Sequence, residues 1–426
     1  MAVKPTRRAA PCGPTSCEVN DMNQNQNTPE LRFGGFTEPW KQRELGQLFD
    51  YEQPGPYIVE STEYNNFYPT PVLTAGKTFI LGYADESFGV KSASPDNPVI
   101  IFDDFTTASH YVDFPFKVKS SAIKLLTLKN SDDDITVASN ALQMLAYIPV
   151  GHERHWISEF AGFNVFIPDS SVEQQFIGTF FRNLDSLIAL QQRKYERLQH
   201  LKQALLRKMF PKPGEQVPEL RFDGFTEPWE ERKFGEEFLF LRNNTLSRAE
   251  LCDADGDVLD VHYGDVLIKY SSVIDITKAN LPRIIDARKV SGCDSLHNGD
   301  VVIADTAEDE TAGKCTELRG IDNERVFSGL HTIPCRPRRI YAPGFLGHYL
   351  NSRAFRKQLF SMMQGTKVVS ISKTSMASTC LTVPSIAEQI TISETLSSID
   401  SLIDLYRRKY ERLLRLKQAL LRKMFV

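Results

Sequence analysis

The chain has 426 residues, a formal net charge of −4, 41% hydrophobic residues and 10% aromatic residues. This is the composition of a globular protein, long enough for two or three domains, and it excludes disorder over most of the length. No run of about 18 apolar residues occurs, which excludes a membrane-spanning helix. The seven cysteines are scattered without a CxxC pair. A cytoplasmic location is therefore predicted, and a zinc site or disulfide framework is not.

The first 28 residues lack the apolar segment of a secretory signal. We predict a disordered tail over 1–28, with Met22 as an alternative start. The globular pattern begins with the motif PELRFGGFTEPWKQREL at 29–45.

Short β-like segments characterise the block that follows, 46–172. Its first part, 51–74, is rich in Pro, Gly, Asn and Tyr, which favours loops and turns. We predict strands at 78–81, 99–102, 114–118 and 163–167 and a short helix at 137–147. Together with the motif, residues 29–172 are predicted to form one compact domain of mixed strands and helices.

A long amphipathic helix is predicted over 173–210. Its apolar residues recur every three or four positions, without Gly or Pro from 184 onward. A helix of this size is on the order of 55 Å long. We interpret its excess of basic residues as a solvated or partner-facing flank. The apolar stripe requires a partner.

The second half repeats this plan after a short stiff linker at 211–217. The motif returns as PELRFDGFTEPWEERKF at 218–234, identical at 12 of 17 positions and offset by 189. A second long helix is predicted over 387–426, and 399–425 is identical to 184–210 at 21 of 27 positions, offset by 215. The blocks between these repeats look unrelated.

The second domain is predicted over 218–386. Gly-Asp turns lead into predicted strands of an up-and-down β element at 264–270 and 299–305. A helix is predicted at 344–361.

These elements predict an α+β fold with an internal pseudo-twofold repeat. Two mixed α/β domains are separated by two long helices that pair as an antiparallel coiled coil. The short linker places the second half at the far end of the first helix, so the second helix must run back. The residues predicted to pair the helices are Leu187, Tyr195, Leu198, Leu201 and Leu205 with Leu402, Tyr410, Leu413, Leu416 and Leu420.

Sequence patterns typical of catalysis are incomplete. Residues 75–78 read AGKT, but Pro71 replaces a glycine that a phosphate loop needs. Residues 253–257 imitate a calcium loop, with Val258 where glycine is required. His152 and His155 have no further zinc ligand nearby, and neither GxGxxG nor GxSxG occurs. No catalytic residue, metal site or cofactor is predicted in this chain.

Candidate nucleic-acid contacts are chosen on chemistry alone. Taken singly, each is more often an ordinary surface residue. They are Lys77, Thr107, His110, Arg154, His155, Lys269, Lys314, Arg336, Arg338, Arg339 and Lys373.

Two copies of PELRFxGFxxPW, each followed by a variable block and an IDxLIxLxxRKYxxLxxLKQALLxKMF helix, resemble the specificity subunit of type I restriction–modification enzymes. The resemblance covers 29–426. It implies two target recognition domains, 29–172 and 218–386, each reading one half of a bipartite site in double-stranded DNA. It also implies helices that hold the domains apart and dock two methyltransferase and two restriction subunits. S-adenosylmethionine, ATP and Mg²⁺ would belong to those partners, and no catalytic residue to this chain.

Two alternatives stay open from the residues alone. One is a structural adapter whose end domains bind proteins, and the other is a self-contained nuclease. Salt-dependent DNA binding separates the adapter from a DNA reader. Metal-dependent cleavage by the isolated chain would indicate the nuclease.

Overall fold

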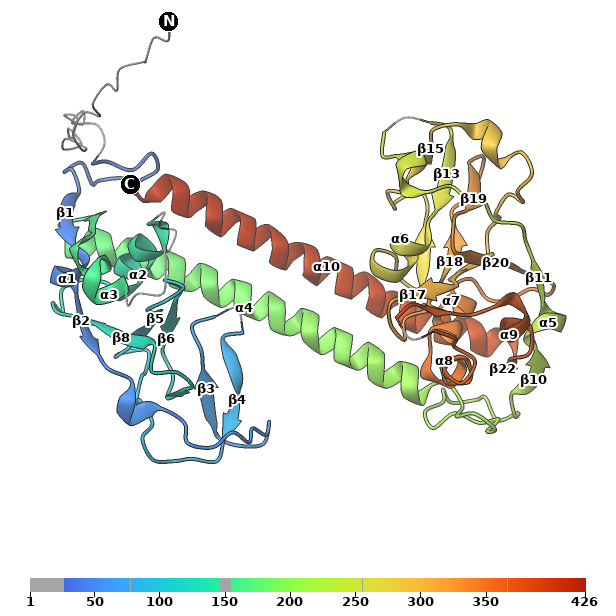
Figure 1. Ribbon diagram of the computed structural model, residues 1–426, viewed down its shortest axis with the longest axis horizontal. Coiled ribbons are helices and arrows are strands. Elements are labelled where there is room, and N and C mark those ends of the chain that lie inside the picture. The colour runs from blue at the N-terminus through green and yellow to red at the C-terminus, as the bar shows by residue number, and fades with distance from the viewer. Residues whose placement is uncertain (1–26, 77, 146, 148–154, 255, 366) are drawn as a thin grey trace, which may run out of the picture. The chain divides into compact units, whose positions relative to one another are not determined.

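The computed structural model of the protein describes residues 27–76, 78–145, 147, 155–254, 256–365 and 367–426 (Figure 1). The chain forms two compact units, Met1–Ala189 with Glu411–Val426, and Leu190–Tyr410. Nearly all of the tail predicted over 1–28 lies outside the described residues. No helix in the described part of the chain is long and apolar enough to cross a bilayer.

Within its described residues, the first unit contains a four-stranded antiparallel sheet in the order β2-β8-β5-β6. A smaller sheet has the order β4-β3-β7, and β1 pairs with β9. The strands are β1 (Lys41–Glu44), β2 (Phe49–Glu52), β3 (Thr70–Leu73), β4 (Ile80–Ala84), β5 (Val99–Asp103), β6 (Ser109–Val112), β7 (Lys117–Val118), β8 (Ile123–Leu128) and β9 (Asn164–Ile167). The short helices are α1 (Leu45–Leu48), η1 (Gly55–Tyr57), α2 (Ile135–Met144), α3 (His155–Ser158) and η2 (Phe160–Gly162).

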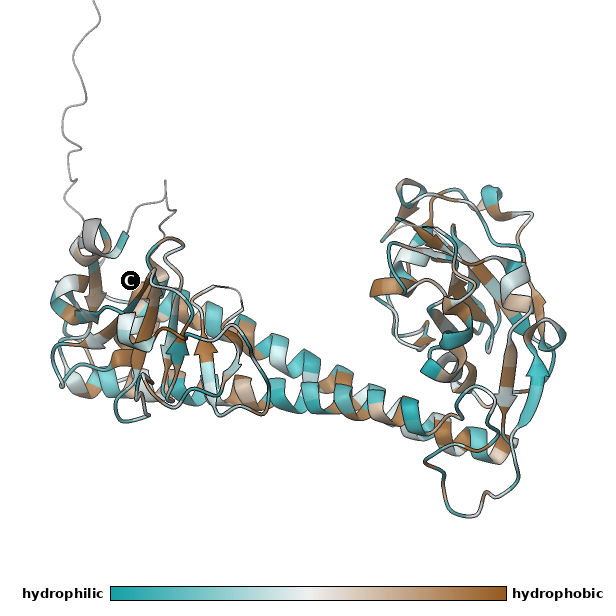
Figure 2. Ribbon diagram, turned by 60° about the horizontal axis from the view of Figure 1, so that its bottom comes forward, coloured by the Kyte–Doolittle hydropathy of each residue, from teal (hydrophilic) through white to brown (hydrophobic). Residues whose placement is uncertain are grey.

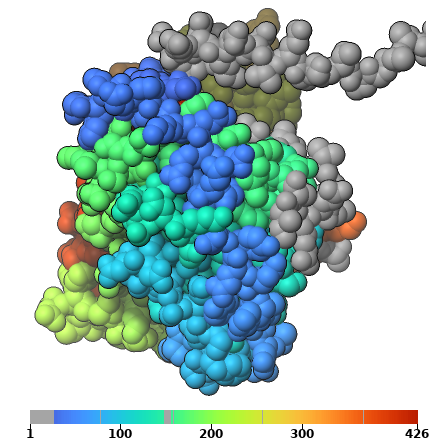
Figure 3. Space-filling model, turned by 90° about the vertical axis from the view of Figure 1, so that its left-hand side faces the viewer, coloured from blue at the N-terminus to red at the C-terminus, as the bar shows by residue number. Residues whose placement is uncertain are grey.

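The core of the first unit lies against the inner strands β5 and β8, whose first four residues are all buried. Here Lys124 and Asp104 form a fully buried ion pair of 3.1 Å. The strands predicted at 99–102 and 163–167 are confirmed. Strand β8 is not predicted from the sequence. Its apolar run is short, and the spacing of its apolar residues does not distinguish a strand from a buried helix. In Figure 3 the segment from β2 to β8, coloured blue to cyan, covers much of the visible face of the unit.

The second unit contains, among its described residues, a five-stranded sheet in the order β11-β20-β16-β18-β14 and a four-stranded sheet in the order β12-β15-β13-β19. Strand β10 pairs with β22, and β17 with β21. The strands are β10 (Glu230–Lys233), β11 (Phe238–Phe240), β12 (Leu251–Cys252), β13 (Val258–Val261), β14 (Val273–Asp275), β15 (Arg283–Ile284), β16 (Val301–Ala304), β17 (Thr306–Ala307), β18 (Cys315–Arg319), β19 (Arg325–Ser328), β20 (Thr332–Pro337), β21 (Val369–Ser370) and β22 (Cys380–Val383). The short helices are α5 (Phe234–Glu237), η3 (Arg248–Glu250), α6 (Tyr263–Ile268), η4 (Ala287–Val290), α7 (Phe345–Leu350), α8 (Arg353–Phe360) and α9 (Lys373–Ala377).

Two predictions for this unit need correction. The strand expected at 264–270 is wrong, since Tyr263–Ile268 form the helix α6. The ring of His262 accepts a hydrogen bond from the Gly264 amide, and this helix cap overrides the β-like pattern. The single helix expected at 344–361 is two helices, because Ser352 starts α8 by capping the Phe355 amide. The strand predicted at 299–305 is confirmed as β16.

The two long helices are α4 (Ser171–Lys208, 38 residues) and α10 (Ile386–Met424, 39 residues). In the first unit, Lys417 contacts Asp185 at 2.6 Å. In the second unit, Lys202 contacts Asp400 at 2.5 Å. The residue numbers of each facing pair add to 602, as antiparallel helices in one register require. The predicted antiparallel pairing is confirmed.

The composition of the buried seam differs from the predicted stripe. Ile188 is 8% exposed, whereas its neighbour Leu187 is 48% exposed. Successive helix residues differ by about 100° around the axis, so adjacent positions cannot share one narrow seam. Teal and brown residues alternate along the long helices in Figure 2. The predicted pairing positions Leu187, Leu201, Leu402 and Leu416 are therefore wrong, since all four are exposed, while Tyr195, Leu198, Leu205, Tyr410, Leu413 and Leu420 are half-buried.

Ile188→Ala should lower the free energy of unfolding by about 2 kcal/mol or more, because it leaves a cavity in the seam. Leu187→Ala, the matched control one position away, should change it by less than about 0.5 kcal/mol. Urea unfolding followed by circular dichroism measures both. Equal effects of the two substitutions would contradict this seam.

Candidate nucleic-acid interface and its junctions

Each unit contains the same buried junction between a repeated motif and the first turn of a long helix. In the first unit, Arg32 Nε and Nη2 donate to the Glu173 carboxylate at 2.6 and 2.7 Å, and Trp40 Nε1 donates at 3.3 Å. Glu173 is 1% exposed. A buried carboxylate is stable only when paired, and the helix N-terminus favours its negative charge. The bond to Glu173 also raises the pKa of Arg32.

The second unit repeats this geometry with Arg221, Trp229 and Glu388. Arg221 Nε and Nη2 donate to Glu388 at 2.8 and 2.9 Å, and Trp229 Nε1 donates at 3.3 Å. The two sets are related by the offsets of the sequence repeats, 189 for the motif and 215 for the helix. The repeat in the sequence is thus a repeat of specific contacts.

Each motif also closes the end of the other long helix. The Leu31 amide donates to the Lys423 carbonyl at 2.8 Å, and the Leu220 amide donates to the Lys208 carbonyl at 2.8 Å. Carbonyls in the last turn of a helix have no partner within the helix, so these bonds cap it. In the first unit the motif therefore joins the start of α4 to the end of α10, and in the second unit it joins the start of α10 to the end of α4.

The candidates in the first unit do not form one site. Thr107 has φ of 59° in the turn after β5. His110 Nε2 lies 3.2 Å from the Ala75 carbonyl, and its ring packs on Phe79. His155 is buried beside the Tyr147 hydroxyl, 3.2 Å from its Nδ1, so the prediction that it contacts nucleic acid is wrong. Lys77 and Arg154 lie outside the described residues.

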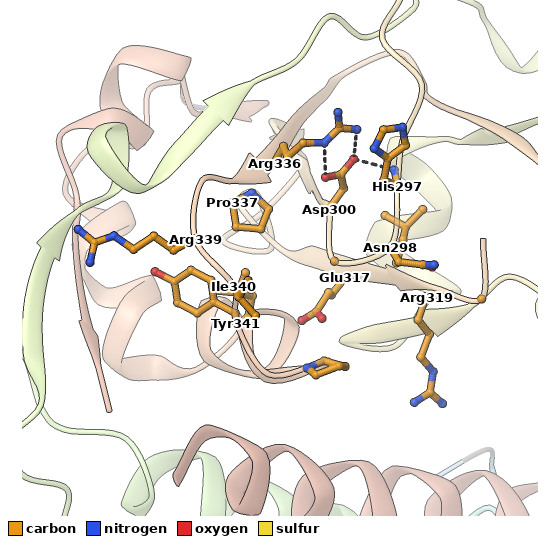
Figure 4. Close-up of a pocket in the computed structure, with 15 residues that line it drawn as sticks. His297, Asn298, Asp300, Glu317, Arg319, Arg336, Pro337, Arg339, Ile340 and Tyr341 are labelled. Carbon is orange, nitrogen blue, oxygen red and sulfur yellow. Dashed lines mark hydrogen bonds and ion pairs between the residues drawn. The ribbon is translucent and has the colours of Figure 1, made fainter. Parts of the chain in front are cut away.

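In the second unit, several candidates lie around a hollow of about 580 Å³ (Figure 4). Arg336 lines it but is engaged by both oxygens of Asp300, at 2.9 and 2.7 Å. Arg339 lies 3.3 Å from Glu237 and is largely exposed. Arg338 is exposed beside them, while its amide donates to the Glu237 carbonyl. This group is the part of the predicted site that the fold brings together.

Buried at the floor of the same hollow is Glu317, which accepts hydrogen bonds from the amides of Gly344 and Gly347. Burial raises the pKa of Glu317 to about 7, although these two bonds favour the charged form. Because the carboxylate caps the start of α7, we assign it a structural role.

A second groove, of about 550 Å³, continues from this hollow, since Arg319 lines both. The groove lies along α10 and is lined by the basic residues Lys269, Lys278, Arg319, Arg407 and Arg408 and the acidic residues Asp275, Asp400 and Asp404. We call Arg339, Arg319, Lys269, Lys278, Arg407 and Arg408 the basic strip. Such side chains suit contact with phosphates.

Sequence reasoning found part of the basic strip and missed the rest. Arg319, Lys278, Arg407 and Arg408 are missed because no local pattern marks them. Two other candidates lie apart: Lys373 donates to the Leu241 carbonyl at 3.3 Å, and Lys314 donates to the Leu267 carbonyl at 2.6 Å. Among the described residues, no group of three His, Cys, Asp or Glu side chains is arranged to hold a metal ion.

The two units thus have different sheets, and each carries the same junction between a motif and a long helix. No protein-family model matches the chain. Over 129 residues the chain is 47% identical to the type I restriction enzyme EcoR124I/EcoR124II specificity subunit of Escherichia coli; the match covers 29% of this chain and 31% of that protein. The chain thus spans about a third of the length of the curated relative it matches.

The fold agrees over nearly the whole chain with the crystal structure of the type I restriction–modification system S subunit from M. genitalium. The TM-score is 0.57 at 15% identity, over 94% of this chain and 99% of that one. In fold, and in sequence over part of its length, the chain is similar to type I restriction–modification specificity subunits. The resemblance predicted from the repeats is confirmed.

Glu173→Gln should destabilise the first unit by about 3 kcal/mol, because it leaves the half-buried Arg32 without its charged partner. Asp169→Asn is the matched control, since it breaks the exposed Lys41–Asp169 pair of 2.7 Å and should cost less than about 1 kcal/mol. Thermal unfolding monitored by calorimetry tests this. A Glu173→Gln protein as stable as the control would show that the junction does not stabilise the fold.

Proposed function

We propose that this chain is the non-catalytic specificity subunit of a cytoplasmic type I restriction–modification complex and binds double-stranded DNA. The observation that carries the proposal is the identical junction beneath two unlike domains. One support with two different domains suits a protein that reads two different half-sites. The similarity to a specificity subunit over 129 residues supports the same role.

In this proposal, residues 29–172 and 218–386 are the two target recognition domains, and each reads one half of a bipartite site. Helices α4 and α10 set the distance between the half-sites. A helix of 38 residues is roughly 57 Å long and stiff, whereas a flexible linker would accept many separations.

We assign the DNA face of the second domain to the basic strip. Arginine and lysine side chains bind phosphates and supply the salt-dependent part of DNA affinity. His297 lines the adjoining hollow, and its ring is of a kind that can bond to base edges. The neighbouring Asn298 side chain is bonded to the amide and carbonyl of Ile321 instead. Asp275, Asp400 and Asp404 line the same groove and neutralise part of this charge. The net positive charge of the basic strip is therefore moderate.

Arg319→Gln should weaken DNA binding and reduce the slope of log affinity against log salt by about one. Arg288→Gln removes the same charge from a side chain that is 91% exposed and lies outside both hollows, so it should have no such effect. Gel shifts at several salt concentrations, with the methyltransferase partner present, measure both. Absence of DNA binding by the unaltered complex would favour the adapter alternative.

Exposed leucines on the long helices support docking of two copies of one partner. Leu187, Leu190 and Leu201 fall on one face of α4, because positions 14 apart return to nearly the same side. Their equivalents on α10, offset by 215, are also exposed: Leu402, Leu405 and Leu416. A surface that occurs twice fits two methyltransferase subunits, with restriction subunits joining them. S-adenosylmethionine, ATP and Mg²⁺ then act in those partners.

Leu187→Asp with Leu201→Asp should remove one methyltransferase copy, and adding Leu402→Asp with Leu416→Asp should remove both. Each charged group would be buried in an apolar interface without a partner. Leu239→Asp alters a comparably exposed leucine on β11 and should leave both copies bound. Native mass spectrometry of the complex counts the copies. Two copies on the fourfold variant would exclude this docking face.

A further inference from the structure

A separate hollow of about 360 Å³ lies in the second unit, between α4 and the helix α8. Among the described residues that line it, Lys202, Lys314 and Arg356 are basic and none is acidic. Lys202 comes from α4, Arg356 from α8, and Lys314 from the residue before β18. Three segments far apart in sequence therefore bring their positive charges to one small space.

These charges are incompletely compensated. Lys202 pairs with Asp400 at 2.5 Å, outside the hollow. Lys314 Nζ donates to the Leu267 carbonyl at 2.6 Å, and Arg356 Nη2 donates to the carbonyls of Ala312, at 3.0 Å, and Glu310. Neutral carbonyls accept hydrogen bonds but do not cancel a positive charge. A partly buried charge whose hydrogen bonds go only to neutral groups is costly, and this applies to Lys314 and Arg356.

Arg356 also has an unused donor. Its Nη1 is buried and has no hydrogen-bond partner among the described residues. Burial lowers the pKa of Arg356, even though Asp309 and Glu310 act in the opposite direction. Burial and the positive charges of Arg356 and Lys202 lower the pKa of Lys314. Lys314 thus lies close enough to Arg356 and Lys202 to be repelled by both, and an anion in the hollow would offset that repulsion.

We propose that this hollow is a binding site for a phosphate group, held by Arg356, Lys314 and Lys202. Arginine presents planar donors that match phosphate oxygens, and lysine adds a compact charge. The nearby Ser271 and Thr311 hydroxyls already donate to the Val273 carbonyl and to Asp309, so charge rather than hydroxyl contacts holds the ligand.

The phosphate has two possible sources. Tyr270 and Ser271 line both this hollow and the groove of the basic strip, so a DNA backbone in that groove would bring a phosphate to this site. This source rests on the proposed function. The other source is free phosphate, which needs no DNA. The chemistry is the same, and the two sources are separated by experiment.

The test measures binding of inorganic phosphate to the full chain by calorimetry at constant ionic strength, with chloride as the reference anion. The unaltered chain should bind phosphate, and Arg356→Gln should weaken binding by about ten- to a hundredfold, the effect of one charged hydrogen bond. Lys314→Met is a second variant that leaves the bonds of Arg356 intact and should also weaken binding. Arg288→Gln is the control and should bind as the unaltered chain does.

Gel shifts of the methyltransferase complex with the same variants separate the sources. If Arg356→Gln and Lys314→Met also weaken DNA binding and phosphate competes with DNA, the site takes a backbone phosphate. If phosphate binds but DNA affinity is unchanged in both variants, the site takes free phosphate. Loss of DNA binding by every form, with phosphate binding retained, would refute only the proposed function. The proposal would be overturned if the unaltered chain bound no phosphate. It would also be overturned if both variants bound phosphate as tightly as the unaltered chain.

Discussion

A carboxylate buried in the first turn of each long helix is the constraint on which this structure depends. Burying the carboxylates of Glu173 and Glu388 is costly unless opposite charges lie beside them. Arg32 and Arg221 supply these charges from the two repeated motifs, and an indole completes the set. Once this pairing is made, the motif must lie across the start of the helix. The path of the chain into each domain is thereby fixed.

The same constraint explains how unlike domains share one support. Beyond the junction, β1 pairs with β9 and β10 pairs with β22 in the same antiparallel register. Gly46 and Gly235 occupy equivalent places where an added Cβ would meet Ala161 or Ala377. These contacts surround the variable blocks and involve few of their residues. The blocks can therefore differ in sequence and strand order while their attachment stays the same.

Charge in the second unit is arranged in two ways. Within the hollow of Figure 4, Arg336 is neutralised by Asp300, so it orders the fold more than it attracts a ligand. Along the basic strip, and in the small hollow beneath α8, positive charge exceeds negative charge among the lining residues. Net charge of the whole chain, which is −4, hides this local excess. Location rather than total charge is what matters for an anionic partner.

By itself, the sequence determined the features that depend on repetition and local pattern: the two long helices, their antiparallel pairing, the mixed domains and the family resemblance. A 27-residue repeat whose apolar residues recur every three or four positions is compatible with few folds other than paired long helices. The tertiary structure decided which side of each helix is buried, because Leu187 and Ile188 are equally apolar and differ only in direction. It also decided that Tyr263–Ile268 is helical and that Arg319 joins the basic strip. Charge clusters such as the basic strip arise from residues far apart in sequence, and no local pattern records which of them will meet.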